Sequence, residues 1–181
     1  MLWGRPVTGW VLDGDVMIVE RPPTATLVGL LLTHPVWLVL TTIVDEEPRN
    51  RFYQELVRFD SRITDELVHE VADRLIESWF GMPRYRARLL WREAASMWPQ
   101  LDGELLGRNC DVAQLPAERA TAVIYHRLSA MHANDKDKGE RWRKALNETP
   151  LAAVRKQAAE PVSKDGEGFM AMLAMSGGRG R

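Results

Sequence analysis

Histidines, a cysteine and evenly spaced arginines are the side chains of this sequence with the clearest chemical potential. Zinc ligands usually recur at short, characteristic spacings. The four histidines instead fall on separate segments, at His34, His69, His126 and His132. We therefore expect ordinary surface or core histidines and no metal site. Cys110 is the single cysteine and has no histidine near it in the sequence, so we expect an unreactive thiol that packs against other side chains.

Other patterns that mark common catalytic sites are missing from the sequence. Gly166, Glu167 and Gly168 look like a fragment of a phosphate-binding loop, but the remaining glycines and a preceding strand are absent. Carboxylates are plentiful, yet no pair stands in the contrasting surroundings that a general acid and a general base need. We predict a protein that is not an enzyme and has no catalytic residues, no cofactor and no metal.

Three arginines four residues apart form a basic row on a predicted helix. Arg84, Arg88 and Arg92 lie on one face, with Tyr85 and Trp91 interleaved, as in a helix-turn-helix-like nucleic-acid-binding protein. The preceding predicted helix offers a matching acidic row, so solvation or ion pairing explains the same spacing. The chain has 24 basic and 25 acidic residues, and its net charge of -1 creates no overall attraction to nucleic acid or to an anionic membrane. We favour the solvated or ion-paired interpretation and expect no nucleic-acid partner.

The elements that carry these side chains are predicted to be helices. Thr64 is placed to cap a helix over residues 65–80, and Gly81 stands where that helix should end. Pro83 and Pro116 suit the first turns of two further helices, because the amide proton that proline lacks is not needed there. At 181 residues and 45% apolar composition, the chain is long enough to bury one sizeable core.

The sequence divides into three parts. Residues 1–23 form an N-terminal β-hairpin segment, in which two β-prone runs flank Asp13 and Gly14, a pair that tolerates the backbone of a tight turn. Residues 24–147 form a helical domain. We expect residues 148–181 to form a flexible tail with a short apolar helix. The predicted fold class is mostly α, a compact helical bundle with a small N-terminal β-hairpin and a flexible C-terminal tail.

One apolar stretch permits a second interpretation. Residues 27–44 contain no acid, lysine or arginine, and these eighteen residues just reach the length of a membrane span. Thr33, His34 and Pro35 interrupt the stretch at its middle, where proline breaks the helix. We favour two short buried helices, one ending near Thr33 and one starting at Pro35. A small membrane protein is the alternative. The N-terminus lacks the features of a secretory signal, so we expect a cytoplasmic protein.

A second apolar stretch lies within the tail. Residues 169–175 are all apolar and rich in methionine, which suits adaptable binding surfaces. Such a segment either docks on its own domain or binds a partner, and both interpretations are open. The candidate partner-binding residues are Phe169, Met170, Met172 and Leu173.

Three groups of residues together resemble the tail assembly chaperones of long-tailed bacteriophages that infect actinobacteria. The first is VLDGDV at 11–16, followed by RPPT at 21–24 and an apolar helix. The second is FGMP at 80–83, after which a helix ends in SMW at 96–98. The third is LDGELLGRNCD at 101–111, which closes with LPAER at 115–119. Similar sequences usually have glycine where this one has Asn109, and asparagine also tolerates left-handed backbone.

This resemblance implies a helical, non-catalytic protein of the host cytoplasm that binds the long tape measure protein and keeps it soluble. It also implies that the protein helps to recruit tail tube protein and then leaves the finished particle. A chaperone of this kind needs apolar surface for a helical client. We expect residues 27–44 and residues 169–175 to supply that surface. Self-association of the chain is a further option.

Overall fold

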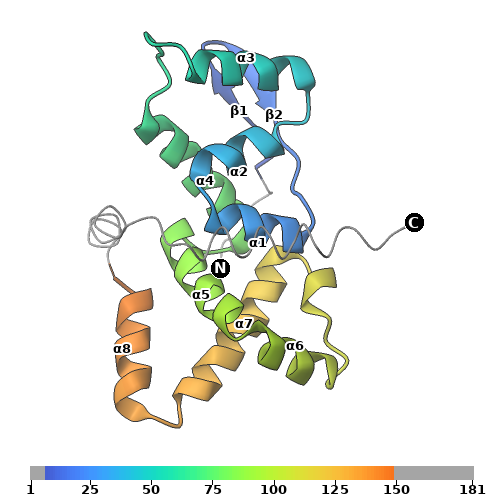
Figure 1. The fold of residues 1–181 in the computed structure, drawn as a ribbon, viewed down its shortest axis with the longest axis vertical. Coiled ribbons are helices and arrows are strands. Elements are labelled where there is room, and N and C mark those ends of the chain that lie inside the picture. The colour runs from blue at the N-terminus through green and yellow to red at the C-terminus, as the bar shows by residue number, and fades with distance from the viewer. Residues whose placement is uncertain (1–6, 149–181) are drawn as a thin grey trace.

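Helices make up most of the chain between residues 7 and 148, which are the residues that the computed structural model describes (Figure 1). The predicted fold class is confirmed for this part of the chain: a mostly α domain with a two-stranded antiparallel hairpin at its N-terminal end. The elements, in chain order, are β1 (Gly9–Leu12), β2 (Asp15–Ile18), α1 (Thr24–Leu32), α2 (Pro35–Thr42), α3 (Glu46–Leu56), α4 (Asp65–Phe80), α5 (Arg84–Ser96), α6 (Trp98–Leu106), the 3-10 helix η1 (Val112–Gln114), α7 (Ala117–His132) and α8 (Lys136–Leu146).

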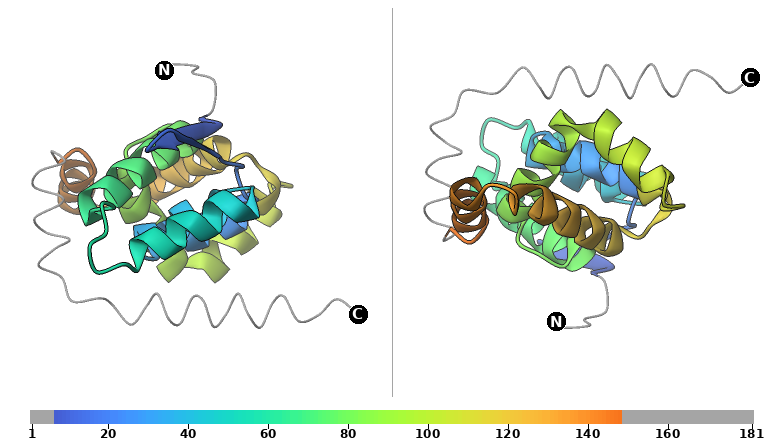
Figure 2. Two further views of the ribbon diagram at one scale, coloured as in Figure 1. Left: turned by 90° about the horizontal axis from the view of Figure 1, so that it is seen from above. Right: turned by 90° about the horizontal axis from the view of Figure 1, so that it is seen from below.

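The core lies where α4, α5 and α7 pack on one another and on the two short helices α1 and α2. The hairpin and α3 sit at one end of the domain, and α6 and α8 lie at the other end (Figure 1). In the views from above and below, α8 lies at one side of the domain (Figure 2). The largest fully buried side chains include those of Leu27, Leu38, Ile76, Trp79 and Leu90.

Helix α4 begins and ends where its sequence predicts. The Thr64 hydroxyl accepts a hydrogen bond from the backbone N–H of Leu67 at 3.2 Å, which caps the first turn. Gly81 ends the helix with φ at 70°, a left-handed conformation that glycine adopts without strain. The spacing of the sequence predicts an apolar stripe of Leu67, Val68, Val71, Leu75 and Trp79 on this helix. The buried face is broader than this stripe, because Ala72 and Ile76 are buried as well.

Two short helices account for the apolar residues 27–44. Thr33 and His34 separate α1 from α2, and Pro35 occupies the first turn of α2. Most large apolar side chains of this stretch are in the core, with Trp37 and Val44 as exposed exceptions. Within residues 7–148, no helix combines the length and apolar character needed to cross a bilayer. The expectation that residues 27–44 offer a client surface is therefore wrong for most of their side chains, because they are already buried.

Pro48 predicts the start of a helix that residues 59–61 would close, whereas α3 runs from Glu46 to Leu56. It begins at Glu46 rather than Pro48, which is compatible with proline because the first turn of a helix leaves its amide protons unbonded. Phe52 is buried and packs edge-on against Trp10, with ring centroids 5.5 Å apart. The apolar spacing of the sequence predicts that Tyr53 and Val57 face inward together with Phe52, but both are exposed.

Helix α8 replaces part of a predicted charged turn. The alternating charges of residues 134–139 predict a solvated turn. The helix instead begins at Lys136, because the Asp135 carboxylate caps it, accepting from the N–H of Lys138 at 3.0 Å. Trp142 and Leu146 are buried, as their spacing predicts. The last helix thereby docks on the end of α5 and α7.

Candidate functional site

The outer face of the hairpin is apolar and uncovered by the described residues. Side chains alternate between the faces of a strand, so Met17 is buried against the helices while its neighbours Val16 and Ile18 point outward. Val11 lies directly opposite Val16. The exposed fractions of Val11, Val16 and Ile18 are 65%, 60% and 49%. Three adjacent aliphatic side chains in water form a patch that a partner can cover favourably.

Residues after α2 extend this patch as a partial third strand. Val19 forms an isolated antiparallel bridge with Ile43, and the N–H of Val44 donates to the carbonyl of Ile18 at 3.0 Å. Val44 therefore stands beside Ile18, and 47% of it is exposed. We define the hairpin face by four residues: Val11, Val16, Ile18 and Val44.

The outer edge of β1 offers backbone groups to a partner. The N–H of Val19 donates to the carbonyl of Thr8 at 3.0 Å, which makes these residues a hydrogen-bonded pair. Because such pairs alternate along an antiparallel ladder, the peptide groups of Gly9 and Val11 point away from β2. Among residues 7–148, no strand pairs with this edge. An extended segment can therefore add to the sheet there.

Acidic side chains flank the hairpin face. Asp13 lies in the turn, Glu20 follows β2, and Asp45 and Glu46 follow Val44; all four are exposed. Two arginines of α3 lie near this rim, and each has a partner of its own. Arg51 pairs with Asp15 at 3.0 Å, and Arg49 donates to the carbonyl of Ile43 at 3.4 Å. The face is thus an aliphatic patch with a negative rim, which suits an apolar partner that carries positive charge.

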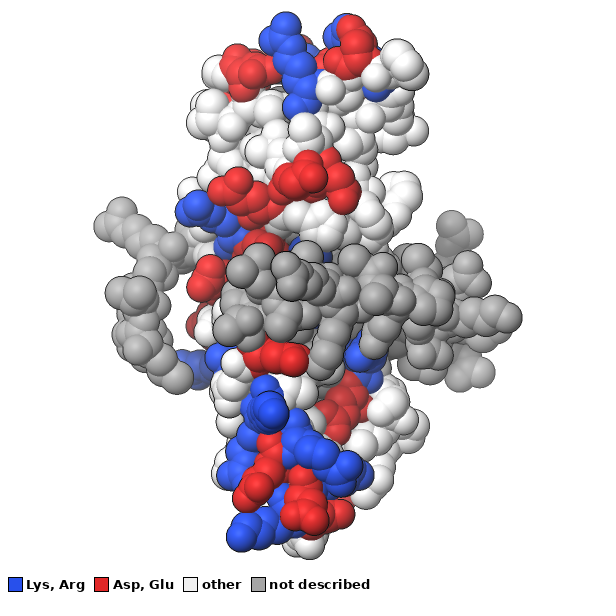
Figure 3. Space-filling view, turned by 90° about the vertical axis from the view of Figure 1, so that its left-hand side faces the viewer, with Lys and Arg blue, Asp and Glu red and all other residues white. Residues whose placement is uncertain are grey.

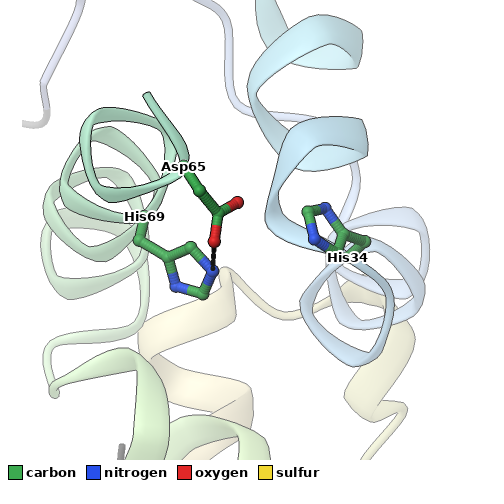
Figure 4. Close-up of side chains that lie close together, drawn as sticks. All are labelled: His34, Asp65 and His69. Atoms are coloured by element: carbon green, nitrogen blue, oxygen red, sulfur yellow. Dashed lines mark ion pairs between the residues drawn. The ribbon is translucent and has the colours of Figure 1, made fainter. Parts of the chain in front are cut away.

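A polar cluster forms between α2 and α4. His34 caps the first turn of α2, and Asp65 and His69 lie one turn apart at the start of α4 (Figure 4). One potential ligand atom from each residue lies within 4.8 Å of the others, so two histidines from separate segments lie near one carboxylate, although their spacing in the sequence is not that of a metal site. In the sequence, the i,i+4 spacing of Asp65 and His69 indicates that these two side chains lie close together on one helix face. Their approach to His34 depends on the packing of α2 on α4, which spacing alone does not give.

The hydrogen bonds of this cluster place protons on the ring nitrogens that would have to bind a metal ion. Arg84 has no acceptor, so its Nη2 donates to Nδ1 of His69 at 2.7 Å. Neutral His69 then carries its proton on Nε2, which faces a carboxylate oxygen of Asp65 at 3.6 Å. In the same way, Nδ1 of His34 accepts from the N–H of Val36 at 3.3 Å. A metal ion needs a free lone pair, whereas the Nε2 atoms of both rings carry hydrogen.

Burial and a nearby cation favour the neutral form of His69. Partial burial lowers the pKa of His69 most, and the Arg84 charge lowers it further. Asp65 and Asp73 act in the opposite direction but do not offset these two causes. The cluster is therefore a hydrogen-bonded contact between α2, α4 and α5 rather than a preformed metal centre.

The arginine row on α5 is not a free phosphate-binding face. Arg84 is buried and pairs with the Asp73 carboxylate on α4, which confirms the ion-paired interpretation for this residue. Arg88 is half-buried and only Arg92 is exposed. Basic side chains also gather on α8 at the lower end of the molecule, but acidic ones are interleaved with them (Figure 3).

A second buried polar group joins the helices near the opposite end of the domain from the hairpin. The carboxylate of Glu93 on α5 accepts from Nε1 of Trp142 on α8, and it also contacts Nε2 of His132 at the end of α7. His132 is buried. His132 is therefore a core histidine whose ring has a hydrogen-bonding partner, as predicted. Cys110 is half-buried, which agrees with the prediction of a thiol that packs against other side chains.

The predicted partner-binding residues Phe169, Met170, Met172 and Leu173 lie outside the described residues. Comparison of the chain with known protein families, with curated proteins and with solved structures finds no match. The hairpin face is the surface that sequence reasoning missed. Its signal was present in Val11, Val16 and Ile18, which alternate with Met17 in a hairpin that has only one face to bury.

Proposed function

We propose that this chain is a tail assembly chaperone of a long-tailed bacteriophage. In this role it binds the tape measure protein in the host cytoplasm, keeps it soluble and brings it together with tail tube protein, without catalysis. The observation that carries the proposal is the uncovered hairpin face beside the open edge of β1. A chaperone that must later release its client needs a small apolar surface of this kind, since a modest buried area gives reversible binding.

The motifs that carry the family resemblance occupy turns that the fold requires. VLDGDV at 11–16 makes the tight hairpin turn, in which Asp13 and Gly14 have φ of 49° and 89°. FGMP at 80–83 joins α4 to α5. Asn109, at the position where similar sequences have glycine, has φ of 56°, the left-handed conformation that such a glycine would adopt. These positions support the resemblance on structural grounds.

The two rival functions receive less support from the described residues. A nucleic-acid-binding face would need the arginine row of α5, but the Arg84 guanidinium is buried in contacts with Asp73 and His69. A membrane protein would need residues 27–44 as one span, but they form two helices whose large side chains are mostly in the core.

Co-expression with a client tests the proposal. If a large helical protein is encoded beside this chain, it is the client to use, and the wild-type chain should keep it soluble and co-purify with it. The double variant Val11→Thr/Val16→Thr should lose most of this effect, because threonine keeps the β-branched shape but makes the face polar. Both side chains are exposed, so the stability of the chain should change by no more than about 0.5 kcal/mol.

Leu106→Thr is the matched control. Leu106 is also about half exposed, at 50%, but lies on α6 at the opposite end of the domain. This variant should hold the client as the wild type does. A chain that is soluble yet neither binds nor rescues the neighbouring protein would remove the basis for the chaperone function.

A further inference from the structure

The hairpin face is suited to bind an apolar segment that carries positive charge, and the chain itself contains such a segment. Four aliphatic side chains are exposed on that face, with a rim of Asp13, Glu20, Asp45 and Glu46. We propose that residues 169–181 of the same chain bind the hairpin face when no client is present. The bound segment would compete with the client, a consequence that rests on the proposed function.

Residues 169–181 match the face in both apolar character and charge. Residues 169–175 are apolar without exception, and they include Phe169 and Met172 among the longer side chains. The segment then continues to Arg179 and Arg181, and no acidic residue follows Glu167. An apolar stretch followed by two cations is complementary to an aliphatic face with an acidic rim. Methionine suits this surface because its flexible thioether adapts to a shallow patch.

The chain between the domain and this segment is long enough to reach the face. Residues 149–168 separate the last described residue from Phe169. Twenty extended residues span about 66 Å at about 3.3 Å each, and a flexible coil of that length averages about 25 Å between its ends. A domain of about 140 residues has a radius of gyration of about 14 Å. The segment can therefore travel from α8 to the opposite end of the domain.

Tethering makes even a weak contact effective. Residues 149–168 tether the segment to its own domain, and a tether of this length corresponds to an effective concentration of about a millimolar. An interaction with a dissociation constant near that value would cover the face for much of the time, yet a client that binds more tightly would displace it. Weak self-coverage would thereby protect the apolar face from non-specific contacts before the client arrives.

Disulfide trapping in the full-length chain tests this occupancy without a client. Cys110→Ser removes the native thiol, and Val16→Cys with Met172→Cys then places one thiol on the face and one on the segment. Oxidised glutathione converts the two thiols to a disulfide and is itself reduced to two thiols. We expect an intramolecular bond, seen as a faster-migrating monomer on a non-reducing gel.

The matched control pairs Met172→Cys with Leu106→Cys in the same background. Leu106 is 50% exposed, similar to the residues of the face, and α6 lies at the same end of the domain as α8 (Figure 1). A segment that moves freely would therefore reach position 106 at least as often as position 16. We expect the bond at position 16 to form about tenfold faster, as local binding requires. Arg179→Glu/Arg181→Glu should slow it several-fold.

Three results would overturn the proposal: equal rates at positions 16 and 106, insensitivity to reversal of the two arginines, or disulfide-linked dimers in place of monomers. Dimers would indicate that a second copy occupies the face. Because no client is present, failure of this test leaves the co-expression result unaffected. Conversely, trapping can succeed in a chain that holds no client, so the two proposals fail separately.

Discussion

Arg84 on α5 donates a hydrogen bond over 2.7 Å to Nδ1 of His69 on α4, and this contact fixes which ring nitrogen carries the proton. The same guanidinium pairs with Asp73, one turn further along α4. The Arg84 side chain is only 8% exposed, whereas that of Asp73 is 56% exposed. One buried cation thus joins two helices while its carboxylate partner stays hydrated.

Replacing Arg84 should weaken the domain measurably. Arg84→Met keeps much of the aliphatic volume but removes the hydrogen bonds to Asp73 and His69. We expect the free energy of unfolding to fall by about 1–3 kcal/mol, because both partners lose a charge-assisted contact but Asp73 remains solvated. Urea unfolding measures the change.

Arg74→Met is the control for this substitution. Arg74 pairs with Glu70 on the exposed side of α4, the helix that also carries Asp73 and His69. Exposed ion pairs contribute little to stability. Its loss should change the free energy of unfolding by no more than about 0.5 kcal/mol. Equal effects of the two substitutions would mean that the buried position of Arg84 adds nothing to stability.

Acidification should destabilise the domain through His69. Partial burial and then the Arg84 charge lower the pKa of this histidine below its ordinary value. As the pH falls through about 6.5, the unfolded chain takes up a proton at His69 while the folded chain does not. Stability is therefore fully present above that pH and is lost as the pH falls toward the lower pKa of the folded state.

His69→Asn isolates this effect from the other histidines. Asparagine places an acceptor near the position of Nδ1, so it keeps the Arg84 contact but does not titrate. Urea midpoints of the variant should depend less on pH than those of the wild type over the acidic range. An NMR titration of wild-type His69 with a pKa at or above the ordinary value would contradict this account.

Zinc should not stabilise the folded chain through the cluster of His34, Asp65 and His69. Binding at Nε2 of His69 requires a proton to move to Nδ1, which then faces the N–H groups of Arg84. A ligand present at about 100 times its dissociation constant would add about 2.7 kcal/mol to stability. We expect no shift in the urea midpoint with zinc. A shift that disappears in Asp65→Asn would show that the cluster does bind the metal.

The sequence predicts elements whose limits are encoded locally. Thr64 and Gly81 define α4 through a side-chain cap and a left-handed end, and the Asp13–Gly14 pair defines the hairpin, so these predictions needed no tertiary information. The prediction that Tyr53 and Val57 face inward is wrong because their orientation depends on tertiary packing. On a short helix at the end of the domain, their spacing is compatible with either face, and packing against the hairpin decides which face is buried.

The candidate sites depend on contacts that sequence spacing does not contain. His34 and His69 are brought near each other by the packing of α2 on α4. The hairpin face becomes continuous with Val44 only because the chain after α2 returns beside β2. The alternation in β2 was visible in the sequence, but which face is left open follows from where α3 packs.

Replacing either of two helical glycines with alanine should change the free energy of unfolding, but in opposite directions. Gly139 is buried in α8, and a Cβ there would lie 2.8 Å from the carbonyl oxygen of His132, where backbone cannot easily yield. Gly139→Ala should therefore lower the free energy of unfolding by about 1–3 kcal/mol, because the clash outweighs the better helix propensity of alanine.

Gly103 lies on the exposed side of α6, and a Cβ there meets no atom within 4 Å. Gly103→Ala should raise the free energy of unfolding by about 0.5–1 kcal/mol, because alanine loses less backbone entropy than glycine in a helix. Urea unfolding of both variants under one set of conditions measures the two changes. If Gly139→Ala also stabilised the chain, the close approach of Gly139 to His132 would be contradicted. The close docking of α8 on the end of α7 would then be contradicted as well.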